Sequence, residues 1–298
     1  NMENFLDQFV QKARLIPAKI VYDEIEDERI VKAVLELKNE GSNPVVVWGI
    51  EQLKKSFGDK LETIEYHVCP EDKNPTFFAW ELLAEWKVDW FISWAVNTTG
   101  QTLKALFKTV WVQEWIKRMS WYFLMNTINW LKIFADCAVQ PNPSDEQLAE
   151  IAYLSIKSAR TFWIKPKVAM LSFSTMWSAD HEMTQKVVSA TKLIKQRLRD
   201  ENITDVELAW ELQLDAAIDI WVASKKVKDW SWSGWANVLI FPDLNSWNIG
   251  YKLVQYFGWA QAIGPILQWV AKPWNDLSRG CSVDDIKVLH AITVLQTV

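Results

Sequence analysis

Glycine, cysteine and histidine are all scarce in this chain of 298 residues, which contains 9, 3 and 3 of them. The cysteines, Cys69, Cys137 and Cys281, have an irregular spacing that predicts neither a disulfide framework nor a zinc site. No apolar run approaches the ~20 residues that a membrane-spanning helix needs. The first residues have neither the basic start nor the apolar core of a signal peptide. We therefore expect a cytoplasmic protein that neither enters a membrane nor holds a metal ion.

An excess of basic residues is also missing. The chain has 32 lysines and arginines against 37 acidic residues, a formal net charge of −5 at pH 7. Nucleic acids are held mainly through clustered lysine and arginine, so this balance disfavours a nucleic-acid partner. With 50% hydrophobic and 23% charged residues, the composition is otherwise that of a soluble globular protein. The length allows one or two domains with a large core.

Tryptophan is the residue type present in large excess. The chain has 20 tryptophans, more than twice the number of its glycines. Glycine usually makes up roughly 7% of a globular protein. Counting every tryptophan as glycine would bring glycine to about one residue in ten, which suits a loop-rich α/β enzyme.

Short β-branched runs alternate with amphipathic helical patterns along the whole chain. The runs predict strands at residues 19–22, 45–48, 90–96, 121–125, 131–139, 168–174, 238–241 and 263–268. The helical patterns cover residues 28–38, 144–160, 179–199 and 283–297. In the second of them, Ser144 and Gln147 have the spacing of a capping box. This alternation predicts an α/β fold in which helices cover both faces of mostly parallel sheets. Ligands then bind at the carboxyl ends of the strands.

The segment 278–285 reads Ser-Arg-Gly-Cys-Ser-Val-Asp-Asp, and its spacing predicts a loop that leads into a helix. Ser282 and Asp285 have the spacing of a helix N-cap and its third helical position. The loop therefore faces a helix N-terminus, where backbone N–H groups favour an anion. Arg279 adds a planar fork of donors suited to a phosphate or carboxyl oxygen. A second interpretation stays open, in which Ser282 and Asp285 only cap the last helix and Arg279 is a surface charge.

Cys281 lies at the same predicted helix start, a position that lowers the pKa of a thiol and suits a nucleophile. However, the sequence places none of the three histidines as its base. The residues therefore favour a packed or merely accessible thiol over a covalent role.

Two further segments have polar residues where strands are predicted to end. Residues 93–100 read Ser-Trp-Ala-Val-Asn-Thr-Thr-Gly, which predicts a strand and then a hydroxyl-rich helix start suited to phosphate oxygens. Residues 243–252 predict a strand end, a turn and a helix. In that helix Asn248 and Lys252 are candidate ligand contacts, or equally a helix cap and a solvated lysine.

These segments, together with Ser-Phe-Ser-Thr-Met-Trp-Ser at 172–178 and Trp-Asn-Asp-Leu at 274–277, resemble the phosphate acetyltransferases. Those enzymes move an acetyl group between coenzyme A and inorganic phosphate. The resemblance covers residues from about 86 to 298 and is weaker before that. It implies a homodimer whose chains have two three-layer α/β domains, with the active site in the interdomain cleft. The implied domains are residues 1–138 plus 270–298, and residues 139–269.

The resemblance implies that Ser278, Arg279 and Asp285 are the catalytic group. Asp285 would take the proton of the coenzyme A thiol in a ternary complex, and the other two would stabilise the oxyanion on the acetyl carbonyl. Coenzyme A, acetyl phosphate and phosphate are the implied small-molecule partners, and no cofactor is implied to stay bound. The residues implied in substrate and coenzyme A binding are Thr98, Thr99, Lys104, Ser174, Thr175, Asn248, Lys252 and Asn275.

Two departures from the resembled family leave alternatives open. Lys104 and Tyr256 stand where the family usually has arginine, so a fork of donors is lost at one position and reduced to a point charge at the other. One alternative is a phosphate butyryltransferase. The other is a catalytically impaired domain that senses acyl-CoA. The intact Ser278, Arg279 and Asp285 argue against a sensing domain, whereas the two lost arginines argue for it.

Tryptophan stands at many positions where the resembled family usually has glycine, and this list includes Trp86, Trp90, Trp94, Trp111, Trp121, Trp163, Trp177, Trp210, Trp247, Trp259 and Trp269. Glycine serves where the backbone φ is positive or a ligand approaches closely, and an overpacked site costs ~1–3 kcal/mol. An aromatic binding surface and ordinary core packing are two other interpretations. We hypothesise that these positions are UGA codons, which some bacterial lineages read as glycine and others as tryptophan.

Overall fold

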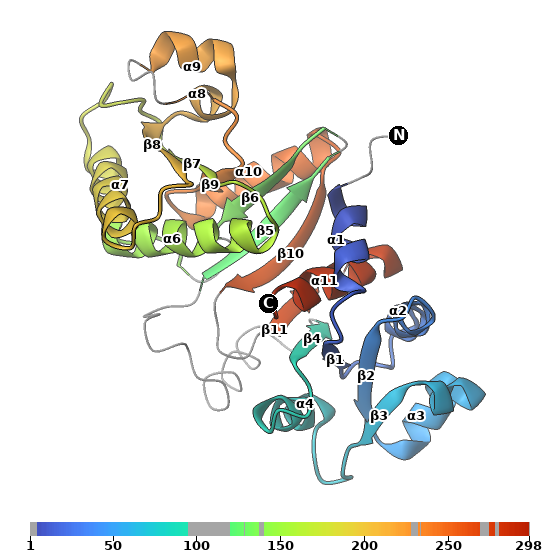
Figure 1. Ribbon diagram of the computed structural model, residues 1–298. Helices are drawn as coiled ribbons and strands as arrows, with labels where there is room; N and C mark the ends of the chain where they lie inside the picture. Colours follow the sequence, from blue (N-terminus) through green and yellow to red (C-terminus); the bar gives the residue numbers. More distant parts are fainter. Residues whose placement is uncertain are drawn as a thin grey trace. The chain divides into compact units, whose positions relative to one another are not determined.

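The computed structural model describes residues 5–94, 120–127, 129–136, 140–227, 232, 234–268, 274–277 and 280–297. The chain divides into two compact units. Unit 1 consists of Asn1–Lys117 and Gly264–Val298, and unit 2 is Arg118–Ile263. Each unit combines a sheet with helices, and most strand pairs in both sheets are parallel (Figure 1). The predicted α/β class with mostly parallel sheets is confirmed.

Unit 1 contains a parallel five-stranded sheet in the order β11-β4-β1-β2-β3. Its strands are β1 Lys19–Tyr22, β2 Asn43–Trp48, β3 Glu65–Val68, β4 Trp90–Trp94 and β11 Trp274–Leu277. The first three strands follow one another outward from β1, whereas β4 and β11 lie on its other side. The strand order therefore reverses between β1 and β4. Open α/β sheets bind ligands at the carboxyl ends of strands beside such a reversal.

Helices cover both faces of the unit 1 sheet. They are α1 Phe5–Ala13, α2 Glu28–Asn39, α3 Ile50–Phe57, the 3₁₀ helix η1 Gly58–Thr63, α4 Pro75–Ala84 and α11 Val283–Leu295. Tyr22 of β1 stacks on His290 of α11, with 6.1 Å between ring centroids. Phe91 of β4 pairs with Val21, so its side chain points to the opposite face, where it meets Trp80 of α4 at 5.1 Å.

Unit 2 contains a six-stranded sheet in the order β10-β5-β6-β9-β7-β8, except that Gly264–Gln268 of the edge strand β10 belong to unit 1. Its strands are β5 Ser120–Asn126, β6 Leu131–Ala135, β7 Lys167–Leu171, β8 Glu207–Leu212, β9 Val238–Ile240 and β10 Gln261–Gln268. Strands β5 and β6 form an antiparallel hairpin, and β6, β9, β7 and β8 run parallel. The helices are α6 Asp145–Thr161, α7 Glu182–Asp200, α8 Leu214–Ile218, α9 Ile220–Lys226 and α10 Leu244–Phe257.

Local sequence explains where the long helices of unit 2 begin and how they pack. Ser144 and Gln147 form the predicted capping box at the start of α6, since each side chain bonds the backbone N–H of the other residue. Helix α6 is buried on most sides and packs against α7 and the sheet. Trp247 of α10 packs on Phe123 of β5, with ring centroids 5.2 Å apart.

The structure differs from the sequence prediction in two respects. Strands β3, β8 and β11 were not predicted, because β3 is a mostly exposed edge strand and the other two carry polar residues among their apolar ones. The predicted domain boundaries near residues 138 and 270 also fall differently from the division at 118 and 264. The hairpin of β5 and β6 lies in unit 2, because β6 pairs with β9 in that sheet.

Candidate active site

Five predicted site residues lie outside the described part of the chain: Ser278, Arg279, Thr98, Thr99 and Lys104. The other six fall into two groups. Unit 1 carries Asp285 and Asn275, and unit 2 carries Ser174, Thr175, Asn248 and Lys252.

Asp285 forms the predicted capping box at the N-terminus of α11. Its Oδ2 accepts hydrogen bonds from the backbone N–H and the hydroxyl of Ser282, both at 2.8 Å, and its own N–H donates to the Ser282 hydroxyl. The cap holds the carboxylate beside the first turn of the helix, where the dipole favours negative charge. A carboxylate has about four lone-pair sites, so capping leaves capacity to accept a proton.

Asn275 has a packing role that differs from the predicted contact with substrate. It is 0% exposed in β11, and its Oδ1 accepts from the N–H of Leu267 at 2.9 Å. Its Nδ2 donates to Thr293 and to Gln296, both at 2.8 Å. The amide therefore ties β11 to β10 and α11, and no exposed atom is left for a ligand.

Cys281 is also packed rather than reactive. Its side chain is 8% exposed, and burial raises the pKa of its thiol to about 12, with a smaller contribution from the negative charge of Asp285. At neutral pH such a thiol stays protonated, and a protonated thiol is a poor nucleophile. The structure therefore supports the packed-thiol interpretation.

Two buried carboxyl groups lie at the strand-order reversal of unit 1, and the sequence reasoning missed both. Asp23 follows β1 and is 2% exposed, and its Oδ2 accepts from Thr76 at 2.5 Å and from Ser93 at 3.4 Å. Asp276 of β11 is 8% exposed and lies opposite Ser93 in the strand register. In each carboxyl group, Oδ1 has no hydrogen-bond partner in the described part of the chain.

Burial raises the pKa of both carboxyl groups, to about 6 at Asp23 and about 7 at Asp276, where the charge of Asp23 adds to the rise. Acids that titrate near neutrality in this way are enriched at functional sites. Asp276 is two residues from Ser278 in the chain. The signal that could have revealed Asp23 is an aspartate directly after the first buried strand, at the carboxyl end of a parallel sheet.

In unit 2, the hydroxyls of Ser174 and Thr175 bond to groups in their own loop and at the end of β8. Ser174 Oγ lies 3.2 Å from the Ser178 hydroxyl and donates to Glu211 at 3.4 Å. Thr175 Oγ1 donates to the side chain of Gln213 at 3.2 Å and accepts from its N–H at 3.1 Å. Both side chains are buried. They fix the turn after β7, in which every backbone N–H from Ser174 to Ala179 also donates to an acceptor within the protein.

Asn248 and Lys252 are the predicted pair that the structure brings together. They lie one turn apart on α10, and the Lys252 ammonium donates to Asn248 Oδ1 at 2.9 Å. Asp243 caps the same helix by accepting from the N–H of Ser246. Lys252 is exposed, so its charge is available to an anionic ligand.

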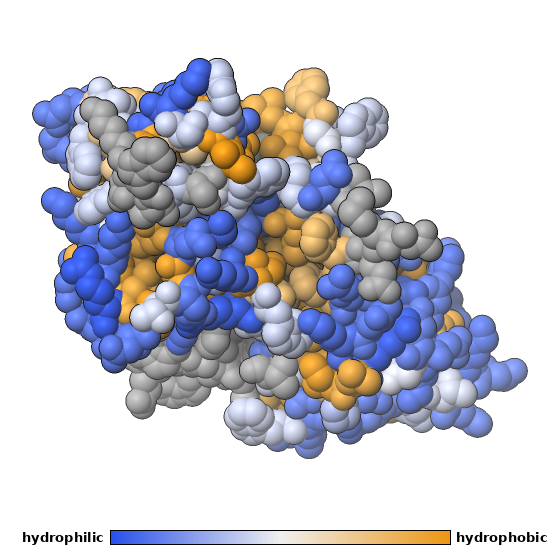
Figure 2. Space-filling view, turned by 45° about the horizontal axis from the view of Figure 1, so that its top comes forward, coloured by the Kyte–Doolittle hydropathy of each residue, from blue (hydrophilic) through white to orange (hydrophobic). Residues whose placement is uncertain are grey.

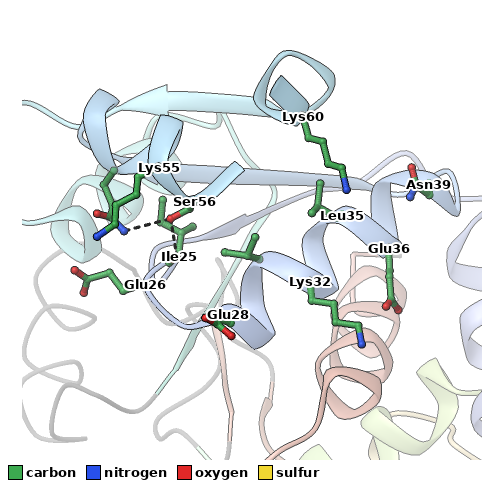
Figure 3. Close-up of a pocket in the computed structure, with 12 residues that line it drawn as sticks. Ile25, Glu26, Glu28, Lys32, Leu35, Glu36, Asn39, Lys55, Ser56 and Lys60 are labelled. Atoms are coloured by element: carbon green, nitrogen blue, oxygen red, sulfur yellow. Dashed lines mark hydrogen bonds between the residues drawn. The ribbon is translucent and has the colours of Figure 1, made fainter. Parts of the chain in front are cut away.

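A pocket of about 610 Å³ lies against α2 and α3 of unit 1, and its lining includes none of the predicted site residues. Figure 3 shows lysine and glutamate side chains around it, namely Lys32, Lys55, Lys60, Glu26, Glu28 and Glu36. Because the two signs balance, this wall offers little attraction to a phosphate-bearing ligand. Within the described ranges, no group of three or more potential ligands could hold a metal ion. No helix in those ranges is long and apolar enough to cross a membrane.

Comparison with known proteins identifies relatives of the whole chain. Residues 68–294 match the protein family described as phosphate acetyl/butaryl transferase. A phosphate acetyltransferase from Clostridium acetobutylicum is 46% identical over 252 residues, which cover 82% of this chain and 73% of the relative. A phosphate acetyltransferase from Thermoanaerobacterium thermosaccharolyticum is 37% identical over 330 residues, which cover 98% of this chain and 99% of the relative. The solved structure of a phosphotransacetylase from Staphylococcus aureus has a TM-score of 0.89 at 34% identity, covering 98% of this chain and 99% of that one.

Proposed function

The chain belongs to the phosphate acetyl/butaryl transferase family, and we propose that it transfers an acetyl group reversibly between acetyl-CoA and inorganic phosphate. The observation that carries this proposal is full-length similarity to phosphate acetyltransferases of known sequence and structure. It is supported by residues 274–277, which form the edge strand β11 of the unit 1 sheet, and by residues 282–285, which form the N-terminal cap and first turn of α11.

The proposed reaction is a direct attack in a ternary complex. The sulfur of coenzyme A forms a bond to the acetyl carbonyl carbon, the bond from that carbon to the phosphate oxygen breaks, and phosphate leaves. The thiol proton goes to Asp285. Arg279 and Ser278 donate to the carbonyl oxygen as it becomes negative, and such oxyanion stabilisation is often the largest catalytic contribution. No step of this proposal requires a metal or a bound cofactor.

The proton transfer to Asp285 requires help from the surroundings. A free thiol has a pKa of ~8.5 and a free aspartate ~3.9, so full transfer is uphill by roughly 6 kcal/mol. A guanidinium and a helix N-terminus both stabilise a thiolate and thereby lower this cost. The N-terminus of α11 also stabilises the carboxylate of Asp285 itself, so its two effects on the transfer oppose each other and the net help is expected from the guanidinium of Arg279.

Unit 2 provides the proposed binding contacts. Asn248 and Lys252 form a polar pair on one side of α10. A lysine is a point charge that suits the phosphates of coenzyme A. Ser174 and Thr175 in the turn after β7 stay proposed contacts of unit 2, and Thr98, Thr99 and Lys104 stay proposed contacts of unit 1.

We also propose that the protein is a cytoplasmic homodimer. Free Cys69 and Cys281 suit a reducing compartment. Helix α10 exposes an apolar face formed by Ile249, Leu253, Tyr256 and Phe257, which are 50–81% exposed. Figure 2 shows hydrophobic residues reaching the surface in patches among hydrophilic ones. Leu253→Asp should produce a monomer in light scattering after gel filtration, whereas Gln255→Asp on another side of the helix should not.

The direct test of function is acetyl-CoA formation from acetyl phosphate and coenzyme A by the purified chain. We expect turnover, and Cys281→Ser should retain it because no acetyl group is carried on that thiol. Labelled phosphate should not exchange into acetyl phosphate unless coenzyme A is present. Exchange without coenzyme A would instead require a covalent acetyl-enzyme. Binding of coenzyme A without any turnover would contradict the transferase and support an acyl-CoA-sensing domain.

A further inference from the structure

Five tryptophans have a backbone conformation that large side chains avoid. Seven non-glycine residues in the described part of the chain have positive φ, and five of them are tryptophan: Trp86 at 59°, Trp163 at 57°, Trp177 at 64°, Trp235 at 62° and Trp259 at 54°. Only 20 of the 298 residues are tryptophan. Positive φ brings Cβ too close to the backbone, so glycine takes these positions most readily and asparagine next.

Four helices of this protein end in one turn geometry and provide an internal comparison. In each, the first residue past the cap has positive φ and donates its N–H to the carbonyl three places earlier in the Schellman pattern, while the next residue donates five places back. At the end of α2 this position is Gly41, with bonds of 3.1 and 3.0 Å. At the end of α7 it is Asn202, with bonds of 3.0 and 2.8 Å. Both residues are those that the geometry favours.

The same position is tryptophan at the ends of α4 and α6. Trp86 donates to Leu83 at 3.3 Å, and the following residue donates to Leu82 at 3.0 Å. Trp163 donates to Arg160 at 2.9 Å, and the following residue donates to Ala159 at 3.0 Å. The hydrogen bonds are therefore those of a helix end that favours glycine, although the residue at this position carries an indole side chain.

Two more tryptophans occupy turns that also require a positive φ. Met176 and Trp177 are the central residues of a turn closed by the N–H of Ser178 donating to Thr175 at 3.2 Å. Both have positive φ, as in a type I′ turn, which glycine and asparagine dominate. Trp259 has positive φ directly after Gly258, the C-cap of α10. Trp235 shares the positive φ and lies in a loop beside Gly234.

Burial of the indole adds little stability that could offset the unfavourable backbone conformation of these tryptophans. Trp86, Trp163, Trp177 and Trp259 are 76%, 57%, 55% and 89% exposed. A tryptophan stabilises a fold mainly by removing its large apolar area from water. The four residues end three different helices and form one loop turn, in both units. What they share is a backbone conformation and not an element or a single aromatic surface.

We propose that the organism incorporates glycine at residues 86, 163, 177 and 259, and that the codon at each is UGA read by a glycine tRNA. The inference is independent of the proposed enzymatic function, because it rests on backbone geometry alone. The buried tryptophans at 90, 121 and 247 lie in strands or in a helix, so the backbone gives no corresponding reason to replace them.

The codons and the mass of the native protein test the proposal together. We expect UGA at all four positions in the gene. Tryptic peptides of the protein purified from its own organism should then have the mass of glycine at these residues. UGG codons would overturn the proposal, and so would UGA codons with the mass of tryptophan in the peptides.

Thermal unfolding of the chain with tryptophan at these four positions provides a separate test that does not need the source organism. Each of Trp86→Gly, Trp163→Gly, Trp177→Gly and Trp259→Gly should raise Tm by about 2–4 °C. The matched control is Gly41→Trp, which places an indole in the same helix end as Trp86. A Cβ at Gly41 meets nothing within 4 Å, so only the backbone conformation opposes it, and Tm should fall by a similar amount. Trp221→Gly, in the first turn of α9, should not raise Tm, because glycine is a poorer helix former than tryptophan. Unchanged or lower Tm in the four glycine variants would overturn the structural reason for the proposal.

Discussion

In unit 1 the buried carboxyl groups of Asp23 and Asp276 titrate near neutrality and each has an oxygen without a described partner. In unit 2 the buried hydroxyls of Ser174 and Thr175 donate to Glu211 of β8 and to Gln213 directly after it. The first arrangement has groups that can exchange protons, whereas the second has a preformed surface with its polar groups already engaged. This contrast favours chemistry on unit 1 and substrate positioning on unit 2. The following variants test that division, from the largest expected effect to the smallest.

Arg279→Ala removes the proposed donor to the oxyanion from the unit 1 segment. We expect kcat for acetyl-CoA formation to fall about 10²–10³-fold, because one such donor typically contributes that much to the rate. Steady-state kinetics with both substrates measure the effect. A variant that keeps its kcat and loses only affinity would assign Arg279 to binding.

Asn275→Ala tests whether the unit 1 asparagine is a packing residue, as its burial indicates. The substitution leaves the N–H of Leu267 and the side chains of Thr293 and Gln296 without their partner, which should cost about 3 kcal/mol of unfolding free energy. Thr293→Val removes one of these bonds and should cost less. Urea unfolding measures both. Unchanged stability with a raised KM for coenzyme A would restore the predicted substrate contact.

Asp276→Asn tests the buried acids through the pH dependence of stability. The pKa of Asp276 is raised above its unfolded value of ~3.9 to about 7. Its contribution to stability is therefore complete below pH ~3.9 and is lost as the pH rises through about 7. Asparagine does not ionise, so the variant loses no stability at this residue as the pH rises. It should therefore unfold at a higher temperature than the parent chain at pH 8 and at a similar temperature at pH 4. A difference of the same size at both pH values would contradict the raised pKa.

Lys252→Ala should have the smallest effect and a different kinetic signature. Removing one exposed charge from the proposed coenzyme A contact should raise the KM for coenzyme A by about tenfold at most and leave kcat unchanged. The control is Lys192→Ala, an exposed lysine of α7, which should change neither value. A loss of kcat in the Lys252 variant would mean that unit 2 takes part in the chemistry.

The sequence predicted the features that depend on local pattern. The buried run of β1 and the capping boxes of α6 and α11 lie where residue spacing placed them, because strand periodicity and cap geometry are set within a few residues. Strand β11 was missed because its four residues, Trp-Asn-Asp-Leu, are polar at the centre and become a strand only by pairing with β4.

The two buried aspartates of unit 1 could not be predicted as a pair from the sequence for the same reason. Asp23 and Asp276 are more than two hundred residues apart, and only the strand order β11-β4-β1 brings them to the two strands that flank β4. The burial that raises the pKa of both is likewise a property of the folded sheet. Asn275 is the converse case, because a residue to which the resemblance gives a substrate contact is fully buried in the folded sheet.

The most direct test of the proposed chemistry compares Asp285→Asn with Asp284→Asn in acetyl-CoA formation from acetyl phosphate and coenzyme A. Both variants remove one negative charge from the first turn of α11, and asparagine at 285 keeps an oxygen that can accept from Ser282. Only the first variant removes the proposed proton acceptor. We predict that kcat falls about 10²–10⁴-fold in Asp285→Asn and stays near that of the parent chain in Asp284→Asn. Equal activity in the two variants would contradict a role for Asp285 as the base.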